Sequence, residues 1–160
     1  FKDKYLSLRF VKKHGTKSDD TMLYQPLNFD GISEFDFKMT KISRSNLIGR
    51  YLEEFKNSVF ILQKEKIKSY AIVHPGNKGH VNISLFISEL PTSAEILLNS
   101  ILKRFQHKTV NVGVPAINRD AVNLFLRKGF IYKEPVLRMY YGERKQYENF
   151  LYGIVSPEKG

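Results

Sequence analysis

The chain has 160 residues, of which 42% are hydrophobic and 13% aromatic, and it contains no cysteine. This length suffices for one hydrophobic core but hardly for two, so we expect one main domain. The absence of cysteine excludes disulfides, a thiolate nucleophile and thiolate metal ligands. No apolar stretch approaches the roughly 20 residues that cross a bilayer, and no signal segment opens the chain, so we expect a soluble, cytoplasmic protein without membrane contact.

The formal net charge of +10 at pH 7 is concentrated at the two ends of the chain. Residues 1–13 carry five Lys or Arg against one Asp, and residues 101–160 carry eleven against five acidic residues. Such ends would attract nucleic acid, an acidic partner or an anionic cofactor, or they would simply form a solvated surface. No zinc-knuckle, RGG or RNP-like pattern favours nucleic acid, which stays an alternative partner.

Three regions follow one another along the sequence. We expect a strand at residues 1–13, a linker leading into the domain at residues 14–30, and the main domain at residues 31–160. The first strand would belong either to a preceding domain of a longer protein, of which this chain would be a fragment, or to this domain itself. The linker is expected because HGTKSDD, at residues 14–20, is polar and rich in turn formers.

Hydrophobic periodicity predicts the order helix, three strands, helix, strand, helix, strands within the main domain. Ser43 or its neighbour would be the N-cap of the first helix, which has an apolar stripe. Strands follow at residues 58–63, 67–73 and 80–88, then a helix at residues 92–105, a strand at 109–114, and closing strands from residue 131 onward. Thr92 and Glu95 have the spacing of a capping box at the start of the second helix.

The most informative segment is residues 109–130, TVNVGVPAINRDAVNLFLRKGF. Three valines alternate with other residues as in a strand, and Pro115 ends the ladder because it has no N–H to donate. Asn118 is a good N-cap for a following helix, and Gly129 can take the left-handed conformation at its end. The apolar face of that helix would consist of Ile117, Ala121, Leu124 and Phe125.

The spacing Asn118-x-x-Ala121-x-x-Leu124-Phe125-x-x-x-Gly129-Phe130 resembles the N-x-x-A-x-x-L-Y-x-x-x-G-F segment of the GNAT (GCN5-related N-acetyltransferase) superfamily. On this segment alone, a generic β–α unit of another α/β domain is the alternative. The strand with Arg138-Met139 and the final Tyr152-Gly153-Ile154 resemble the C-terminal domain of tandem-GNAT proteins, where Asp36 and Arg44 also have counterparts. The resemblance extends over residues 30–160.

The resemblance implies an α+β fold of GNAT type. Its mixed, mostly antiparallel sheet has splayed parallel fourth and fifth strands, here residues 80–88 and 109–114, and helices on both faces. It also implies transfer of an acetyl group from acetyl-CoA to the amine of a small molecule or peptide, with a preceding GNAT domain of the same chain, or a second copy in a dimer, as partner. The residues that it places at the cofactor are Phe86, Ile87, Ser88, Thr92, Ser93, Asn118 and Phe125.

The chain departs from the family pattern at two of these places. Active members have R/Q-x-x-G-x-G/A before the phosphate-binding helix, whereas residues 88–96 read SELPTSAEI, without glycine, Arg or Gln. Glu89 adds negative charge and Pro91 removes an N–H, so we expect a degenerate acetyl-CoA site. Phe125 replaces the Tyr that often protonates the departing thiolate, and its phenyl ring cannot donate a proton. Phe125 is therefore either a core residue or a cofactor contact. Asn118 likewise has two interpretations: it is an N-cap, or it contacts the pantetheine arm of the cofactor.

The remaining candidates define two further alternatives. Asp36 and Arg44 are either a pocket pair that receives an acidic or zwitterionic substrate or a structural ion pair. No carboxylate stands out as a general base among Glu34, Glu53 and Glu54, so the catalytic residues stay unknown. The four histidines lack metal-ligand spacing, and we expect no metal site. The alternative function is a non-catalytic basic module on the same fold that binds nucleic acid or an acidic partner.

Overall fold

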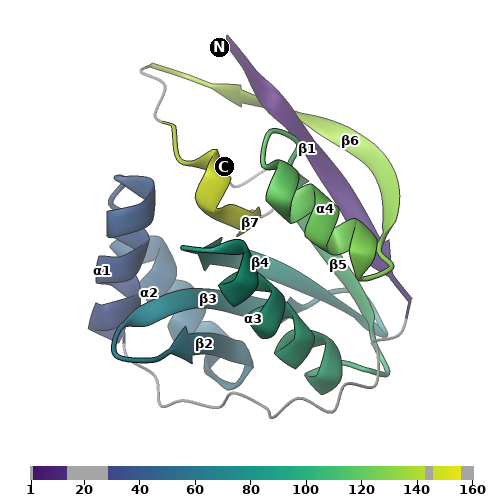
Figure 1. Ribbon diagram of the computed structural model, residues 1–160, viewed down its shortest axis with the longest axis horizontal. Coiled ribbons are helices and arrows are strands. Elements are labelled where there is room, and N and C mark those ends of the chain that lie inside the picture. Colours follow the sequence, from purple (N-terminus) through teal and green to yellow (C-terminus); the bar gives the residue numbers. More distant parts are fainter. Residues whose placement is uncertain (1, 14–28, 143–145, 156–160) are drawn as a thin grey trace.

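The computed structural model describes residues 2–13, 29–142 and 146–155. These residues form one mixed seven-stranded sheet and four α-helices (Figure 1). The strands are β1 (Lys2–Lys12), β2 (Val59–Gln63), β3 (Ile67–Pro75), β4 (His80–Ser88), β5 (Thr109–Pro115), β6 (Ile131–Tyr140) and β7 (Leu151–Gly153). The helices are α1 (Phe29–Thr40), α2 (Ser45–Glu54), α3 (Pro91–Arg104) and α4 (Arg119–Arg127), and the short 3-10 helices η1 (Lys56–Ser58) and η2 (Glu148–Phe150) precede β2 and β7.

The strand order is β2-β3-β4-β5-β1-β6, and β7 pairs with β4 outside this path. Neighbouring strands are antiparallel except β4 and β5, which run parallel from the pair His80↔Thr109 to the pair Ile83↔Val112. Beyond Ile83 the ladder between β4 and β5 stops, close to Leu85, which has a left-handed φ of 49°. The predicted mixed, mostly antiparallel sheet with splayed parallel fourth and fifth strands is confirmed.

Because successive side chains of a strand point to opposite faces of the sheet, the apolar ones form two hydrophobic layers, one on each face. In β3, Ala71 and Val73 join the cluster formed with α3 and α4, whereas Tyr70 and Ile72 join the cluster formed with α1 and α2. In Figure 1, α3 and α4 lie in front of the sheet. The predicted helices on both faces are therefore confirmed, and Phe125, which is fully buried, belongs to the first cluster.

The strand predicted at residues 1–13 forms β1, which lies between β5 and β6 and pairs with both (Figure 1). Its origin, in a preceding domain or in this one, stays a prediction, as do the domain boundaries at residues 13 and 30. The predicted linker lies outside the described residues up to residue 28. Its last two residues, Phe29 and Asp30, already belong to α1.

Four local predictions were wrong or incomplete. Helix α1 was missed, although Ile32, Phe35 and Met39 are buried at helical spacing. The N-cap of helix α2, predicted at Ser43 or its neighbour, is the neighbour Arg44, which makes no side-chain cap bond. Ile117 is 42% exposed because it precedes the N-cap and so lies outside the helical face.

The fourth wrong prediction is the capping box at the start of α3. The helix begins at Pro91, with Leu90 as N-cap and no side-chain cap bond. Proline is favoured at the first helical position because its φ is already helical and its missing N–H is not needed there. Thr92 therefore lies inside the helix, and Glu95 pairs with Lys128, the C-cap residue of α4, at 2.7 Å.

Candidate functional site

The gap between the separating ends of β4 and β5 is filled by the chain's own segment 148–155 (Figure 1). Strand β7 pairs with β4 through Phe86↔Gly153 and Ile87↔Leu151. On the other side of the gap, the Ile154 N–H donates to the carbonyl oxygen of Gly113 in β5 at 2.9 Å. This segment, which we call the closing segment, therefore joins the two strands where the ladder between them has ended.

Two glycines allow the closing segment to approach the sheet. A Cβ at Gly153 would lie 3.0 Å from the Cβ of Phe86 and 3.3 Å from a methyl carbon of Val112. A Cβ at Gly113 would lie 3.0 Å from Cγ1 of Ile154. Contacts this short to Cβ and β-branched atoms leave no room for a side chain, so glycine at both positions permits this packing.

Asn118 ties the closing segment to the N-terminus of α4. Its Oδ1 accepts a hydrogen bond from the Ala121 N–H at 3.0 Å, which confirms the predicted N-cap. Its Nδ2 donates to the carbonyl oxygens of Leu151 at 2.8 Å and Asn149 at 3.1 Å. The side chain is 3% exposed, and all these bonds are made within the chain.

The other residues proposed to contact the cofactor lie in three places. Phe86 and Ile87 lie beside the closing segment, fully buried. Ser88 is also buried and its hydroxyl donates to the Leu90 carbonyl oxygen at 2.8 Å. Thr92 is exposed and Ser93 is buried in the first turn of α3. The structure thus groups Phe86, Ile87 and Asn118 around the closing segment.

Phe125, the seventh of these residues, lies away from that group, inside the layer under α4. Its ring stacks on Phe10 with the centroids 6.0 Å apart and meets Phe130 edge-on at 5.0 Å. It is fully buried. These contacts support the core interpretation of this residue over a cofactor contact.

Negative charge at the start of α3 is held in place by two lysines. Glu89 accepts from Nζ of Lys68 at 2.9 Å and lies 3.6 Å from Nζ of Lys38. The hydrogen bond from Lys68, together with the charges of both lysines, lowers the pKa of Glu89, so it is ionised at neutral pH. The residue immediately before the N-cap of this helix is therefore an anion, and the two lysines balance its charge.

Asp36 and Arg44 form a buried ion pair between α1 and α2. The carboxylate is fully buried and accepts from Arg44 Nε at 3.0 Å and Nη2 at 2.5 Å, and from the Tyr70 hydroxyl at 2.5 Å. Burial would lower the pKa of Arg44, but the hydrogen bond and charge of Asp36 outweigh this effect and raise it. Burial raises the pKa of Tyr70, which keeps this hydroxyl a donor.

Both oxygens of Asp36 are therefore used inside the protein, and the Arg44 side chain is only 16% exposed. A group that binds a substrate must present free donors or acceptors to it, and this pair presents few. The geometry thus supports the structural interpretation of the pair over the pocket interpretation. The same connection between α1 and α2 contains Lys41, whose left-handed φ of 57° makes the tight bend that brings Arg44 back to Asp36.

A second polar group beside this pair was missed by sequence reasoning. Glu148 is 3% exposed, and its Oε2 accepts from the Tyr147 N–H at 3.1 Å. The guanidinium of Arg138 lies 6.0 Å from the ring centroid of Tyr5, within the range of a cation–π contact. Burial raises the pKa of Tyr5 well above its ordinary value. No local pattern marks these residues, because they come from β1, β6 and η2.

The three carboxylates considered as general bases lie on the surface. Glu34, Glu53 and Glu54 are all exposed. Glu34 lines a cavity of about 300 Å3 beside Lys38 and Lys66. Within residues 2–13, 29–142 and 146–155, no three His, Cys, Asp or Glu side chains are placed to hold a metal ion. In the same ranges, no helix has the length and apolar character needed to span a membrane.

A parallel strand pair that separates inside an otherwise antiparallel sheet, with helices on both faces, defines the acetyltransferase class of α+β folds. A family model described as an acetyltransferase (GNAT) domain matches residues 32–153, and the chain therefore belongs to the GNAT acetyltransferase family. Domains of this family generally bind acetyl-CoA. The search of curated proteins found no match to the chain.

Solved structures support the same fold. A presumed acetyltransferase from Pyrococcus horikoshii superposes on 99% of the chain with a TM-score of 0.73 and 20% identity. A GNAT-family acetyltransferase from Colwellia psychrerythraea and another presumed one from Novosphingobium aromaticivorans each superpose on 82%, with TM-scores of 0.65 and 0.64 and identities of 14% and 12%. The chain spans 53%, 54% and 61% of the lengths of these three proteins.

Proposed function

We propose that this chain is the C-terminal GNAT-fold half of a longer N-acetyltransferase and that acetyl-CoA is held by the other half. The acceptor would be the amine of a small molecule or peptide, as the family resemblance implies. One fact supports a longer parent: the chain spans about half of the first two structural relatives. This half would form a wall of the substrate site or stabilise the active half.

The observation that carries the proposal is the closing segment between β4 and β5. The family resemblance puts the pantetheine arm of acetyl-CoA into this gap. In the chain, the gap holds β7, with Leu151 and Tyr152 only 2% and 1% exposed. The residues present therefore do not fit an inserted cofactor, because Asn118 and the backbone of β4 already bond to the closing segment.

The cost of opening the gap is a large fraction of the binding free energy of a typical cofactor. Exposing two large apolar side chains costs about 1.5–3 kcal/mol each, before any hydrogen bond is counted. A micromolar complex is worth about 8 kcal/mol, and each 1.4 kcal/mol changes the affinity tenfold. Opening at a cost of about 5 kcal/mol would therefore weaken a micromolar site to the millimolar range.

The test measures cofactor binding and the state of the closing segment together. Acetyl-CoA, CoA and ADP are titrated calorimetrically into the 160-residue chain at low salt, and amide hydrogen exchange is followed by NMR. The reporter is the Ile154 amide, which donates to Gly113. We expect no saturable binding below millimolar acetyl-CoA and an unchanged, slow exchange of this amide.

Micromolar binding of acetyl-CoA with loss of protection at Ile154 would refute the proposal, because it would show that the cofactor displaces the closing segment. A matched variant is Asn118→Ala, which removes the two bonds to the closing segment and also the N-cap. Arg119→Gln, on an exposed residue of the same turn, is its control. Tight cofactor binding by the alanine variant alone would show that the gap is closed by the segment and not by a lack of cofactor contacts.

A further inference from the structure

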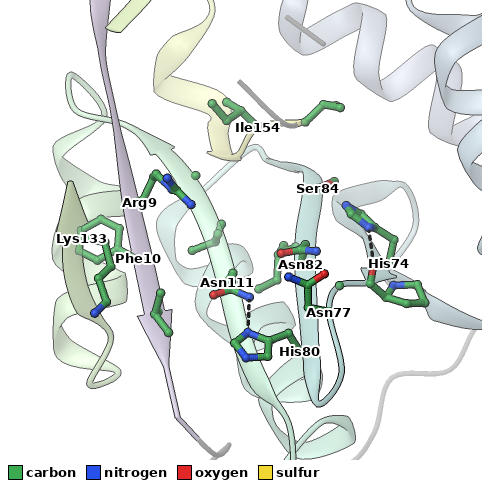
Figure 2. A pocket seen from close by; sticks show the side chains of 17 residues that line it. Arg9, Phe10, His74, Asn77, His80, Asn82, Ser84, Asn111, Lys133 and Ile154 are labelled. Carbon is green, nitrogen blue, oxygen red and sulfur yellow. Dashed lines mark hydrogen bonds between the residues drawn. The ribbon is translucent and has the colours of Figure 1, made fainter. Parts of the chain in front are cut away.

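A polar cavity of about 740 Å3 lies on the sheet face opposite α3 and α4 (Figure 2). It is bordered by β1, β3, β4, β5, β6 and the end of the closing segment. Its volume lies within the range of small-molecule sites, about 300–1,000 Å3. We call it the basic cavity, because the described residues that line it include Arg9, Lys133, His74 and His80 but no Asp or Glu.

The floor of the basic cavity consists of two rows of residues that run across neighbouring strands. In the first row, His74 of β3 pairs with Asn82 of β4, and Asn82 pairs with Asn111 of β5. Residues paired across strands point to the same face, so these side chains form one continuous polar row. With strands about 4.8 Å apart, the row is about 10 Å long, the size of a small metabolite.

The second row is cationic. Arg9 of β1 pairs with Lys133 of β6 on one side and with Gly113 of β5 on the other. Like charges directly opposite each other on one face destabilise a sheet, and among the described lining residues there is no acid to compensate them. Gly113 has no side chain, and the side chain of Ile154, which also lines the cavity, packs over it. A bound anion would offset the repulsion between the two cations.

Hydrogen bonds fix several of the polar groups around the first row. The Asn111 amide Nδ2 donates to His80 Nδ1 at 3.2 Å, and His74 Nδ1 lies 3.0 Å from the Pro75 carbonyl oxygen (Figure 2). In His80, Nδ1 accepts a hydrogen bond, so the proton of the neutral ring is on Nε2, which can donate to a ligand. In His74, Nδ1 donates to the carbonyl oxygen, so Nε2 of the neutral ring is an acceptor. Figure 2 shows Arg9 on one side of the cavity, His74 on the other, and Asn111 and Asn82 between them. Such preorganised groups bind a ligand at little entropic cost.

We propose that the basic cavity binds a phosphate monoester. Arg9 and Lys133 take the phosphate group, whose charge at pH 7 is about −1.5 to −2 and which an arginine can bind through two parallel hydrogen bonds. The row from His74 to Asn111 hydrogen-bonds the hydroxyl, carbonyl or amide groups of the rest of the molecule. This site lies outside the gap between β4 and β5, and the proposal does not depend on acetyl transfer.

The test uses three probes that share the phosphate: inorganic phosphate, ribose 5-phosphate and adenosine 5′-monophosphate. Each is titrated into the 160-residue chain while the side-chain amide signals of Asn82 and Asn111 and the backbone signal of Gly113 are followed by NMR. We expect saturable shifts of these signals, a dissociation constant of about 1 mM or below for a probe with a polar body, and weaker binding of inorganic phosphate. Binding also weakens as salt is added.

The matched variants separate a built site from general attraction to a basic protein. In Arg9→Gln/Lys133→Gln, we expect the affinity for the phosphate probes to fall at least about tenfold, because charge-assisted hydrogen bonds are lost. In the control Arg104→Gln/Lys108→Gln, which removes the same charge from exposed residues outside the cavity, we expect less than about a twofold change, consistent with screening. Circular dichroism confirms that both variants fold.

Three outcomes would overturn the proposal. The first is the absence of saturable binding of all three probes. The second is an equal loss of affinity in the two double variants, which would show non-specific attraction. The third is a set of shifts located away from Asn82, Asn111 and Gly113. If the phosphate probes fail but an acidic peptide shifts the same three signals, the cavity is a protein-binding surface and the phosphate proposal is wrong.

Discussion

Replacing Asp36 by alanine tests the interpretation of the Asp36–Arg44 pair most directly. The carboxylate accepts three hydrogen bonds from Arg44 and Tyr70, and it is fully buried. Alanine would leave a guanidinium that is only 16% exposed without its counter-ion, and a fully buried Tyr70 hydroxyl without an acceptor. The substitution should therefore be among the most destabilising in the chain.

The expected loss follows from what remains behind in the variant. Breaking a buried ion pair by removing one partner costs about 3–5 kcal/mol, because the other charge stays buried. Tyr70→Phe removes one hydrogen bond to a charged group and should cost less, about 1.5–3 kcal/mol. Since single domains are stable by only about 5–15 kcal/mol, we expect Asp36→Ala to lower the free energy of unfolding by a large fraction of its total.

The assay is urea unfolding followed by circular dichroism, with the free energy taken from the midpoint at constant m-value. The double variant Asp36→Leu/Arg44→Met removes both charges and fills the space with apolar atoms. Such replacements are often near neutral, so we expect it to be more stable than Asp36→Ala by about 2 kcal/mol or more. Asp36→Asn keeps the shape of the side chain and serves if the alanine variant does not fold.

A loss below about 1 kcal/mol in Asp36→Ala would contradict the structural interpretation, because that is the size of a surface ion pair. The structural interpretation would also be contradicted if the double variant lost as much free energy of unfolding as the two single variants together, because the effects of residues that act as a pair do not add. Either result would return the pair to the role of a substrate-binding pocket, in which binding and not stability depends on Asp36.

Three further predictions concern packing and pH. Gly153→Ala would bring a Cβ to 3.0 Å from a Cβ of β4, and we expect thermal melting to show a loss of about 1–3 kcal/mol. Burial raises the pKa of Tyr70, and that of Tyr152 to about 12, so both favour the neutral form in the folded state. Their contribution to stability is present below their ordinary pKa of about 10 and is lost as the pH rises. The tyrosinate absorbance of these two residues, taken as the difference from the Tyr70→Phe and Tyr152→Phe variants, should appear only as the protein unfolds. The hydrogen bond from Lys128 lowers the pKa of Glu95, so its contribution is present above the ordinary value of 4.5 and is lost as the pH falls, which melting in acid measures.

Each of these predictions has a control or a contrary outcome. Gly49→Ala places its Cβ 3.2 Å from the far end of the Phe29 ring, which can move, and a helical Gly→Ala change should stabilise by about 0.4–1 kcal/mol. If Gly153→Ala and Gly49→Ala changed the stability equally, close packing would not be what determines the effect of these substitutions. Early tyrosinate absorbance from Tyr70 in the folded protein would contradict its burial. An unchanged acid melting curve in Glu95→Gln would show that its ion pair contributes nothing measurable.

Local chemistry was enough to predict the centre of the fold from the sequence. The strand at residues 109–114 and the following helix are specified by Pro115, Asn118 and Gly129, each of which acts within a few residues of itself. Asn118 accepts the capping bond and Gly129 has a φ of 79°, as predicted. Signals of this kind do not depend on the rest of the chain, so single-sequence reasoning captures them.

The missed elements depend on partners that are distant in the sequence. Helix α1 carries Asp36 on its buried side, where an acidic residue breaks the apolar pattern, and only Arg44 and Tyr70 explain its burial. The capping box at Thr92 failed because Pro91 begins the helix one residue earlier. A search for sequence patterns does not show which of two competing local signals starts a helix. It also does not show that distant residues pair with a buried acidic side chain.

The closing segment is the clearest case of a site that the sequence does not reveal by itself. Strand β7 has three residues, too few for a periodicity, and its place between β4 and β5 rests on Gly113, Gly153 and the amide of Asn118. Asn118 was predicted either as a cap or as a contact to the cofactor. In the structure it is the cap, and its remaining donor capacity is used by the chain's own backbone.

The loop without glycine before α3 and the closing segment are consistent with one physical explanation. A glycine-rich loop exposes backbone N–H groups to a pyrophosphate, and it has no use where the pantetheine arm has no channel to enter. Here the loop lacks glycine, Glu89 is held as an anion beside α3, and the closing segment fills the gap between β4 and β5. Restoring glycines to the loop alone should therefore not restore cofactor binding, because the hydrogen bonds from the Asn118 amide and to the Gly113 carbonyl oxygen would still hold the segment in place.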